Sequence, residues 1–158
     1  MPYVAADDKE SDGCFLCGAW AAEDDAAALI VHRAAATMIL LNRYPYNNGH
    51  LLIAPAAHKA DLGDLTDDAL LELIHETRRA QALLTAAIHP HGFNIGINLA
   101  AVAGAGVPGH LHVHVVPRWQ GDTNYMTTVA GTRVIPQSLE DLRAALLAEL
   151  PNRTEGRP

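Results

Sequence analysis

The chain has 158 residues, of which 49% are hydrophobic and 18% charged, a balance typical of a globular domain rather than a disordered segment. This length fits one domain, and no apolar run approaches the roughly 18 residues that a membrane span needs. The formal net charge of −7 disfavours binding along a nucleic-acid backbone, which requires a basic surface, and the acidic start of the chain has no secretion leader. We therefore expect a soluble, cytoplasmic protein that binds neither nucleic acid nor membranes.

The first chemical motif is the pair Cys14 and Cys17, which are the only two cysteines. In a reducing compartment the C-x-x-C spacing is compatible with half of a metal site, with a redox pair and with a chance occurrence. A metal site needs two further ligands, for which His58 and His110 are the candidates. Two thiolates and two imidazoles would form a closed, tetrahedral zinc site of the structural kind.

Three short apolar runs come next and predict β-strands. Residues 29–33 and 37–41 are separated by three alanines and indicate a hairpin, and residues 50–54 indicate a third strand. Residues 42–49, with the sequence Asn-Arg-Tyr-Pro-Tyr-Asn-Asn-Gly, are rich in turn formers, and their Asn-Gly pair can adopt positive φ.

One long helix is predicted to start after Thr66 and to end before Pro90. Thr66 is a favourable N-cap, and two aspartates follow it at the positive end of the helix dipole. Apolar or small residues repeat at helical spacing, namely Leu70, Leu73, Ile74, Thr77, Ala80, Leu84 and Ile88. His75 falls on or beside the polar side, and His89 and His91 flank the proline at the exit, so we expect these three histidines on the surface.

A fourth strand is predicted over residues 93–98, followed by a loop over residues 99–109 that is rich in alanine and glycine. Small residues such as Gly104 and Gly106 let backbone amides approach an anion closely. The alternative is a plain flexible connector, because glycine-rich loops alone are weak evidence of a site. The loop leads directly into residues 110–116, and this position favours the anion-binding interpretation.

Residues 110–116, His-Leu-His-Val-His-Val-Val, place an imidazole at every second position between apolar residues. Because side chains alternate faces along a strand, His110, His112 and His114 would share one face. Three imidazoles are poor core material, since each ring needs partners for two nitrogens. The residues alone allow a solvated strand face, a metal site, or a histidine nucleophile with flanking helpers.

A second helix is predicted over residues 138–150. Ser138 is placed to cap it, and one side carries Leu139, Leu142, Ala145, Leu146 and Leu150. We expect a single domain over residues 14–150, with a flexible N-terminus over residues 1–13 and a flexible tail over residues 151–158.

The run at residues 110–116 resembles the signature of the histidine triad superfamily. The resemblance extends over nearly the whole chain and includes residues 42–45, 49–55, 94–98 and 117–119. Residues 112–125 are most similar to the bacterial diadenosine tetraphosphate phosphorylase branch. The resemblance implies an α+β fold, with the long helix packed on a central antiparallel sheet, a C-terminal helix, and a homodimer in which two sheets join.

The resemblance also implies a covalent mechanism, in which the middle histidine, His112, attacks the α-phosphorus of a nucleotide. The nucleotidyl-histidine intermediate is then resolved by phosphate, water or another acceptor. His112 suits this role chemically, because an imidazole with an unperturbed pKa of about 6.5 is largely neutral near pH 7. His114 would donate to the phosphate and the transition state, and His50 would support the site from beside it.

Binding roles are implied for residues around the triad. Asn42 would meet the ribose hydroxyls, Asn98 would line the phosphate pocket, and the loop with Gly104 and Gly106 would offer amides to the developing charge. Trp119 either stacks on an adenine or covers the sheet edge or a subunit interface. Tyr44 and Tyr46 are expected at the pocket rim or at an interface.

Zinc-bearing triad proteins pair a C-x-x-C motif with a histidine after the third strand and with the first triad histidine. The resemblance therefore implies a structural zinc on Cys14, Cys17, His58 and His110, and no organic cofactor. The predicted activity is nucleotidyl transfer from a dinucleoside polyphosphate such as diadenosine tetraphosphate to phosphate. The alternatives are hydrolysis of a dinucleotide or of a nucleoside phosphoramidate and, in a different class, a non-catalytic nucleotide-binding module.

One departure from the family pattern bears on the acceptor. Gly106 and Val107 stand where many relatives carry Gln or Ser, whose side chains donate to the leaving group or bridging oxygen. Because glycine and valine offer no such side-chain donor, the choice between phosphate and water as acceptor stays open.

Overall fold

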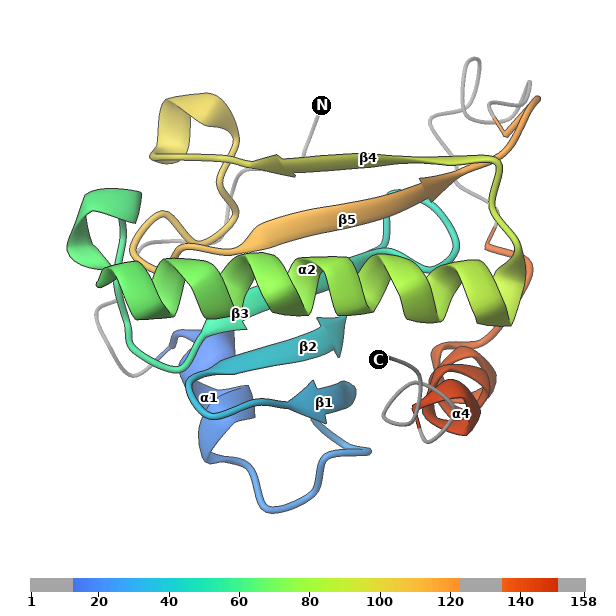
Figure 1. The fold of residues 1–158 in the computed structure, drawn as a ribbon, viewed down its shortest axis with the longest axis horizontal. Coiled ribbons are helices and arrows are strands. Elements are labelled where there is room, and N and C mark those ends of the chain that lie inside the picture. Colours follow the sequence, from blue (N-terminus) through green and yellow to red (C-terminus); the bar gives the residue numbers. More distant parts are fainter. Residues whose placement is uncertain (1–12, 123–134, 151–158) are drawn as a thin grey trace, which may run out of the picture.

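The structure is a computed structural model that describes residues 13–122 and 135–150. They form one five-stranded antiparallel sheet with helices on both faces (Figure 1). The strand order is β1-β2-β3-β5-β4, with bounds β1 Ile30–Arg33, β2 Thr37–Leu41, β3 Leu51–Pro55, β4 Gly92–Ile97 and β5 Val113–Arg118. The predicted α+β architecture is confirmed, and the predicted strands lie within a few residues of the observed ones.

The first face of the sheet is covered by α2 (Asp67–Ile88), and α4 (Leu139–Glu149) packs beside it against β1. Both helices have the predicted side-chain caps, because Thr66 Oγ1 accepts from Ala69 N–H at 3.3 Å and Ser138 Oγ accepts from Asp141 N–H at 3.1 Å. The core beneath them includes Leu41, Leu51, Ile53, Leu73, Ala80, Leu83, Leu84, Val113, Val115, Leu142 and Leu146.

One position of the predicted packing stripe is wrong. Ile74 is 60% exposed, whereas Leu83, which was not part of that stripe, is fully buried. Successive helical residues are about 100° apart, so a helix that buries Leu73, Ala80 and Leu84 turns Ile74 toward solvent and Leu83 toward the sheet.

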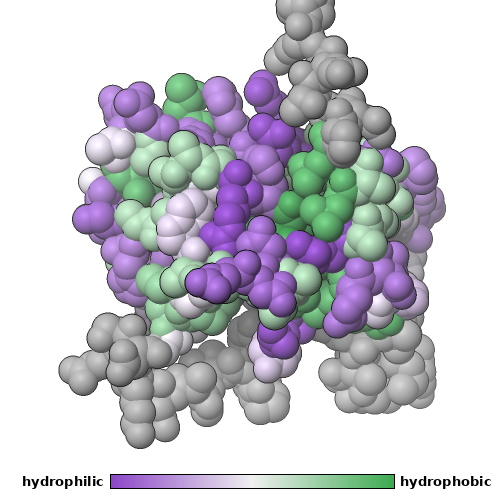
Figure 2. All heavy atoms as spheres, turned by 90° about the horizontal axis from the view of Figure 1, so that it is seen from below, coloured by the Kyte–Doolittle hydropathy of each residue, from purple (hydrophilic) through white to green (hydrophobic). Residues whose placement is uncertain are grey.

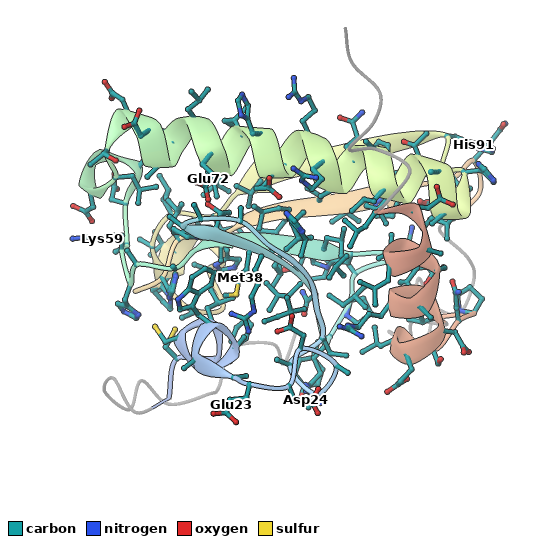
Figure 3. All side chains as sticks on the ribbon, turned by 60° about the horizontal axis from the view of Figure 1, so that its bottom comes forward. Glu23, Asp24, Met38, Lys59, Glu72 and His91 are labelled. Carbon is teal, nitrogen blue, oxygen red and sulfur yellow. The ribbon has the colours of Figure 1, made fainter. Side chains whose placement is uncertain are left out.

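The opposite face is covered by a short helix, α1 (Phe15–Ala21), which the sequence did not lead us to predict. Leu16 and Ala19 of α1 pack on a second apolar cluster from the strands, made of Ile30, Met38, Leu40, Leu52 and Ala54. Figure 3 shows Met38 between the strands and α1, with α2 on the far side of the sheet. Two single-turn 3-10 helices complete the described elements, η1 (Leu62–Asp64) and η2 (Ala101–Ala103).

The histidine strand is shorter than expected. β5 begins only at Val113, three residues after the start of the predicted strand, because Leu111 N–H donates to Lys59 C=O outside the strand ladder. His110 and His112 therefore precede the regular strand, and strict alternation does not govern where their rings point. From Val113 onward β5 pairs with both β3 and β4, so His114 lies inside the sheet.

The surface seen from the side of α1 and β1 mixes both kinds of residue, with hydrophobic side chains (green) interrupted by hydrophilic ones (purple) in Figure 2. Within the described ranges, no helix combines the length and hydropathy that crossing a membrane requires. Apart from Gly13, the ends that we predict to be flexible, residues 1–13 and 151–158, lie outside the described part of the chain.

Candidate active site and metal site

The His112 ring is held by the backbone just before β5. Its Nδ1–H donates to the backbone carbonyl of His110 at 2.8 Å, which leaves Nε2 as the nitrogen with the free lone pair. The side chain is buried, with the residue only 5% exposed, and burial lowers the pKa of His112. A neutral ring with an unprotonated Nε2 is what a nucleophilic imidazole requires.

His114 is held by a second histidine. Tyr46 N–H donates to His50 Nδ1 at 3.1 Å, so His50 carries its proton on Nε2 and donates it to His114 Nδ1 at 2.9 Å. His114 therefore carries its own proton on Nε2, a buried atom with no hydrogen-bond partner among the described residues. Burial, helped by His112, lowers the pKa of His114 to about 4. His114 is thus a neutral donor whose proton is available to a ligand.

A glycine makes this histidine pair possible. Gly49 precedes His50 with φ of +80°, in the left-handed region, and a Cβ there would lie 2.7 Å from Ile88 Cδ1 and 2.8 Å from Pro117 Cγ. Only glycine fits without displacing these side chains. The close approach brings the chain into β3 with His50 fully buried beside His114.

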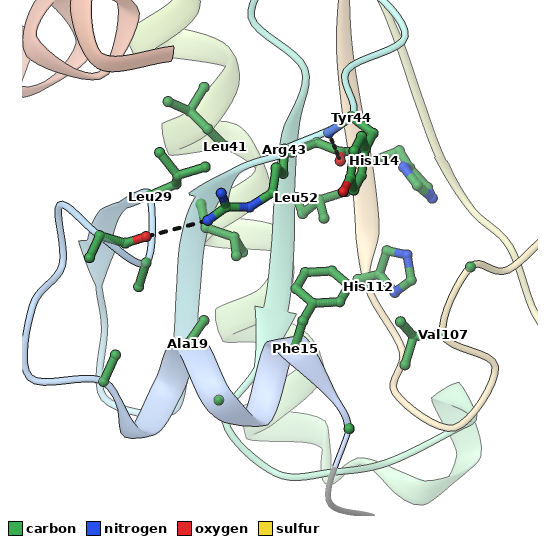
Figure 4. A pocket seen from close by; sticks show the side chains of 18 of the residues that line it. Phe15, Ala19, Leu29, Leu41, Arg43, Tyr44, Leu52, Val107, His112 and His114 are labelled. Carbon is green, nitrogen blue, oxygen red and sulfur yellow. Dashed lines mark hydrogen bonds between the residues drawn. The ribbon is translucent and has the colours of Figure 1, made fainter. Parts of the chain in front are cut away.

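The rings of His112 and His114 border a pocket of about 920 Å³ on the α1 face of the sheet (Figure 4). The floor comes from Leu40 and Leu52, and one wall comes from α1. The remaining lining includes Asn42, Arg43, Tyr44, Tyr46, Gly106 and Val107. A largely apolar slot with some polar side chains, among them the acidic Glu23 and Asp24, suits a ligand that has a planar apolar part and a polar part.

The predicted binding residues divide into two groups. Asn42 and Gly106 line the pocket with His112 and His114, as do both tyrosines. Asn98 and Gly104 do not line it and instead contact each other, since Asn98 Nδ2 donates to Gly104 C=O at 3.4 Å. Their role toward phosphate stays a prediction.

Trp119 lies at the end of β5, where its backbone N–H donates to Asp122 Oδ2 at 3.2 Å. The same carboxylate accepts from Asn47 Nδ2 and pairs with Arg118, and these bonds hold the pKa of Asp122 down at about 2. The indole is not part of the pocket lining. Stacking of Trp119 on a base stays a prediction, as does the alternative of an edge or interface role.

Two further residues line the pocket, and the sequence predicted no site role for either of them. Phe15 lies in the pocket wall with 49% of its surface exposed. Arg43 crosses the pocket and donates to Ala27 C=O at 3.5 Å. Among the described residues Arg43 is the only lysine or arginine of the lining. The available signal for Phe15 was a large aromatic residue between the two cysteines of the C-F-L-C motif. Nothing in the neighbouring sequence indicated that its helix lies over the sheet.

The four predicted metal ligands lie together beside the active site. Ligand atoms of Cys14, Cys17, His58 and His110 are all within 4.8 Å of one another. The shortest contacts are 3.2 Å from Cys17 Sγ to His58 Nδ1 and 3.3 Å from Cys14 Sγ to His110 Nδ1. A tetrahedron with ordinary zinc bond lengths has edges of roughly 3.3–3.8 Å. The three sulfur–nitrogen contacts of 3.2, 3.3 and 3.4 Å are close to these edges and so fit a four-coordinate metal site.

The chemistry of the cluster also fits a metal. His110 Nε2–H donates to Pro55 C=O at 2.8 Å, so the lone pair of Nδ1 faces the sulfurs. Histidines that bind a metal usually donate their other ring N–H to a carbonyl or carboxylate in this way. Burial and the neighbouring Cys14 raise the pKa of the Cys17 thiol. A cation is the group that would hold both sulfurs as thiolates.

Comparison with protein families and curated proteins places these residues in context. Residues 23–121 match the family model described as HIT domain. An "AP-4-A phosphorylase" from Mycobacterium tuberculosis is 46% identical over 125 residues, which are 79% of this chain and 64% of that protein. The chain thus spans somewhat less than two thirds of this relative. A "Bis(5'-nucleosyl)-tetraphosphatase [asymmetrical]" from Schizosaccharomyces pombe is 32% identical over 59% of this chain and 50% of its own length.

Comparison with solved structures supports the fold. A zinc-bound histidine triad family protein from Mycobacterium smegmatis superposes with a TM-score of 0.74 and 26% identity, over 92% of this chain and 99% of the other. A protein from Sulfolobus tokodaii, described as a hypothetical histidine triad nucleotide-binding protein, gives a TM-score of 0.71 at 24% identity, over 88% and 93% of the two chains.

Proposed function

We propose that this chain, which belongs to the histidine triad (HIT) family, transfers a nucleotidyl group from a dinucleoside polyphosphate such as diadenosine tetraphosphate to inorganic phosphate. The observation that carries the proposal is the pair of imidazoles at one end of the pocket, with the Nε2 lone pair of His112 beside the Nε2–H of His114. The 46% identical relative named as an AP-4-A phosphorylase supports this choice of substrate.

The proposed reaction has two displacement steps. His112 Nε2 attacks the α-phosphorus, a nitrogen–phosphorus bond forms, and the bond from phosphorus to the bridging oxygen breaks, so that ATP leaves from diadenosine tetraphosphate. Inorganic phosphate then attacks the adenylyl-histidine, which gives ADP and restores the neutral ring. His114 donates its Nε2–H to a non-bridging oxygen in both steps and so stabilises the developing charge.

The ring positions are fixed from outside the pocket. The His110 carbonyl holds the His112 ring by Nδ1, and His50 holds the His114 ring by Nδ1. Both donor and nucleophile are neutral at pH 7 because burial lowers both pKa values. No proton has to leave His112 before attack, which is consistent with turnover near neutral pH.

The test is incubation with diadenosine tetraphosphate, with and without phosphate, and identification of the products. ADP plus ATP formed only with phosphate supports the phosphorylase. AMP plus ATP formed without phosphate would favour the hydrolase, which the tetraphosphatase relative makes the second candidate. Nucleotide binding without turnover, retained in His112→Ala, would favour a non-catalytic module. His75→Ala, on the exposed side of α2, is the matched control for loss of a histidine.

We also propose that Cys14, Cys17, His58 and His110 hold a structural zinc. Support comes from the size of the cluster, the orientation of His110, and the related structure described as zinc-bound. With four protein ligands, zinc would cross-link α1 to the chain before β5 and keep no open position for substrate. Elemental analysis should find about one zinc per chain and much less in Cys17→Ala; protein purified without chelator that holds no zinc contradicts the proposal.

We propose, third, a cytoplasmic homodimer joined through β4. This strand is at the edge of the sheet, and Ile95 on it is 47% exposed. A free edge with an apolar side chain is suited to pairing with a second copy. Light scattering after gel filtration should give twice the chain mass, and Ile95→Lys should shift it toward the monomer; a wild-type monomer at micromolar concentration contradicts the dimer.

A further inference from the structure

We propose that Arg33 is a positioning residue for substrate binding, because it holds α1 in place as a wall of the pocket. This inference rests on the proposed function, since it concerns how the same pocket binds its nucleotide. Arg33 does not line the pocket itself. It acts through the helix that does.

α1 is not a self-sufficient helix. It has only seven residues, and Cys14 at its N-cap makes no side-chain capping bond. Helices shorter than about 12 residues are marginal in water, because few backbone bonds offset the ordering of the chain. The last carbonyls of such a helix also have no partner within it. The position of α1 must therefore be fixed by contacts from outside.

Arg33 supplies those contacts at the C-terminal end of α1. Its Nη1 donates to Trp20 C=O at 2.7 Å, and its Nη2 donates to Ala19 C=O and Ala22 C=O at 3.0 Å each. The guanidinium carbon also lies 5.3 Å from the centre of the Trp20 ring. A positive charge at the negative end of a helix adds to these bonds. One side chain thus pairs with three carbonyls at the end of α1, in addition to the backbone bond that Ala19 C=O accepts from Ala22 N–H at 3.2 Å.

An irregularity in β1 aims Arg33 at α1. The pairing of β1 with β2 runs Ile30 to Leu40 and then His32 to Ile39, so a bulge leaves Val31 as the extra residue. Strict alternation would put Arg33 on the same face as Val31, under α2. The bulge moves His32 to the α2 side, where it meets Glu76, and turns Arg33 to the α1 side.

The same turns of α1 form the pocket wall. Phe15, Gly18, Ala19 and Ala22 line the pocket, and Ala19 and Ala22 also accept the hydrogen bonds from Arg33. His112 and His114 are held by other groups, none of them on α1. A loosened α1 should therefore weaken binding of the nucleotide in both the ground state and the transition state, which raises KM and leaves kcat unchanged.

The experiment compares Arg33→Met, Arg33→Lys and the control Arg143→Met. Arg143, on α4, donates to Ile30 C=O at 2.6 Å, so its loss removes an arginine bond to a backbone carbonyl of β1 and none to a carbonyl of α1. We expect Arg33→Met to raise KM for diadenosine tetraphosphate and Kd for AMP about tenfold, equivalent to about 1.4 kcal/mol, with kcat within twofold. Arg33→Lys should be intermediate, because an ammonium lacks the planar fork. The control should keep KM.

Hydrogen exchange supplies a readout that does not depend on turnover. Amides in residues 18–22 should exchange faster in Arg33→Met, and in Arg143→Met they should keep the wild-type rate. A purely structural role would lower the active fraction and kcat with KM unchanged, and that result would overturn the inference. An equal rise of KM in the control would also overturn it. If Arg33→Met does not fold, Arg33→Lys decides by the same criteria.

Failure of the proposed function would give a different result from failure of the Arg33 inference. Wild-type protein that neither turns over diadenosine tetraphosphate nor binds AMP would contradict the function. Faster exchange confined to residues 18–22 would then still support the anchoring role of Arg33 toward α1, and unchanged exchange would overturn it.

Discussion

The two faces of the sheet are covered by helices of opposite character. α2 has 22 residues, a Thr66 cap and a continuous aliphatic contact with the strands. α1 has seven residues and no cap of its own, and it is held by Arg33 at one end and lies at the cysteine–histidine cluster at the other. The pocket lies on the α1 face. The long α2 covers its face of the sheet with aliphatic side chains, whereas the short α1 packs only Leu16 and Ala19 on its face and leaves room for a ligand beside them.

The comparison implies that stability depends mainly on one face and chemistry on the other. We therefore expect changes within the α2 core to leave the histidine rings in place, except next to Gly49, where Leu84 and Ile88 lie close to the turn before His50. Variants on either face therefore test whether the two faces act independently.

The largest effect is expected for His112→Ala. Removal of the nucleophile should lower kcat by roughly 10³- to 10⁶-fold, on the scale of other nucleophile removals. Because the ring lines the pocket and not the α2 core, the protein should stay folded, and loss of this buried ring and its hydrogen bond should cost about 1–2 kcal/mol of unfolding free energy. Product formation and a denaturant melt measure the two quantities. Near-normal turnover would show that His112 is not the nucleophile.

On the opposite face, Leu83→Ala should act on stability alone. Leu83 is fully buried in the α2 core, so truncation should cost about 2–5 kcal/mol of unfolding free energy. KM and kcat of the remaining folded protein should stay within twofold. Leu71→Ala, on a residue of the same helix that is 56% exposed, is the control and should cost less than about 0.5 kcal/mol. A large rise in KM for Leu83→Ala would mean that the two faces are coupled.

The same contrast separates what the sequence could predict from what it could not. The packing of α2 follows from local periodicity, because Leu73, Ala80 and Leu84 report one buried side. The metal cluster was predictable from the cysteine pair and the family resemblance, which singled out His58 and His110 from the nine histidines of the chain. The family, the fold and the proximity of the four metal-ligand candidates are confirmed.

The α1 face could not be predicted because its arrangement depends on distant contacts. Alternation along I-V-H-R places Arg33 on the wrong face, and only the bulge at Val31, set by the pairing of β1 with β2, corrects it. The late start of β5 likewise depends on a bond from Leu111 to the distant Lys59. Phe15 keeps the 49% exposure of a surface residue in the folded protein, and it becomes a pocket residue only because α1 lies over the sheet.

An acid titration should reveal the cost of keeping His114 neutral. The folded pKa is about 4, below the usual value of 6.5. As the pH falls from 6.5 toward 4, the unfolded chain takes up a proton that the folded chain does not, so the folded state loses stability, by about 3 kcal/mol in all. Above pH 6.5 this contribution should be constant, and below the folded pKa no further loss should occur.

The measurement is the difference in unfolding free energy between wild type and His114→Gln as a function of pH. Protonation of the metal ligands affects both proteins, so the difference isolates His114. The advantage of wild type over the variant should shrink by about 3 kcal/mol between pH 7 and pH 4. A pH-independent difference would mean that His114 has an ordinary pKa and is not the neutral donor that the proposed reaction uses.

The smallest effect is expected at Asp25, which accepts from Arg33 Nε at 2.8 Å. The Asp25 side chain is 45% exposed, and ion pairs of this kind contribute less than about 1 kcal/mol. Asp25→Asn should therefore raise KM less than twofold, against about tenfold for Arg33→Met, in the same kinetic assay. If the two variants raised KM equally, the ion pair and not the capping of the α1 carbonyls would orient the arginine. The comparison thus distinguishes a helix held by charge from a helix held by hydrogen bonds to its last turn.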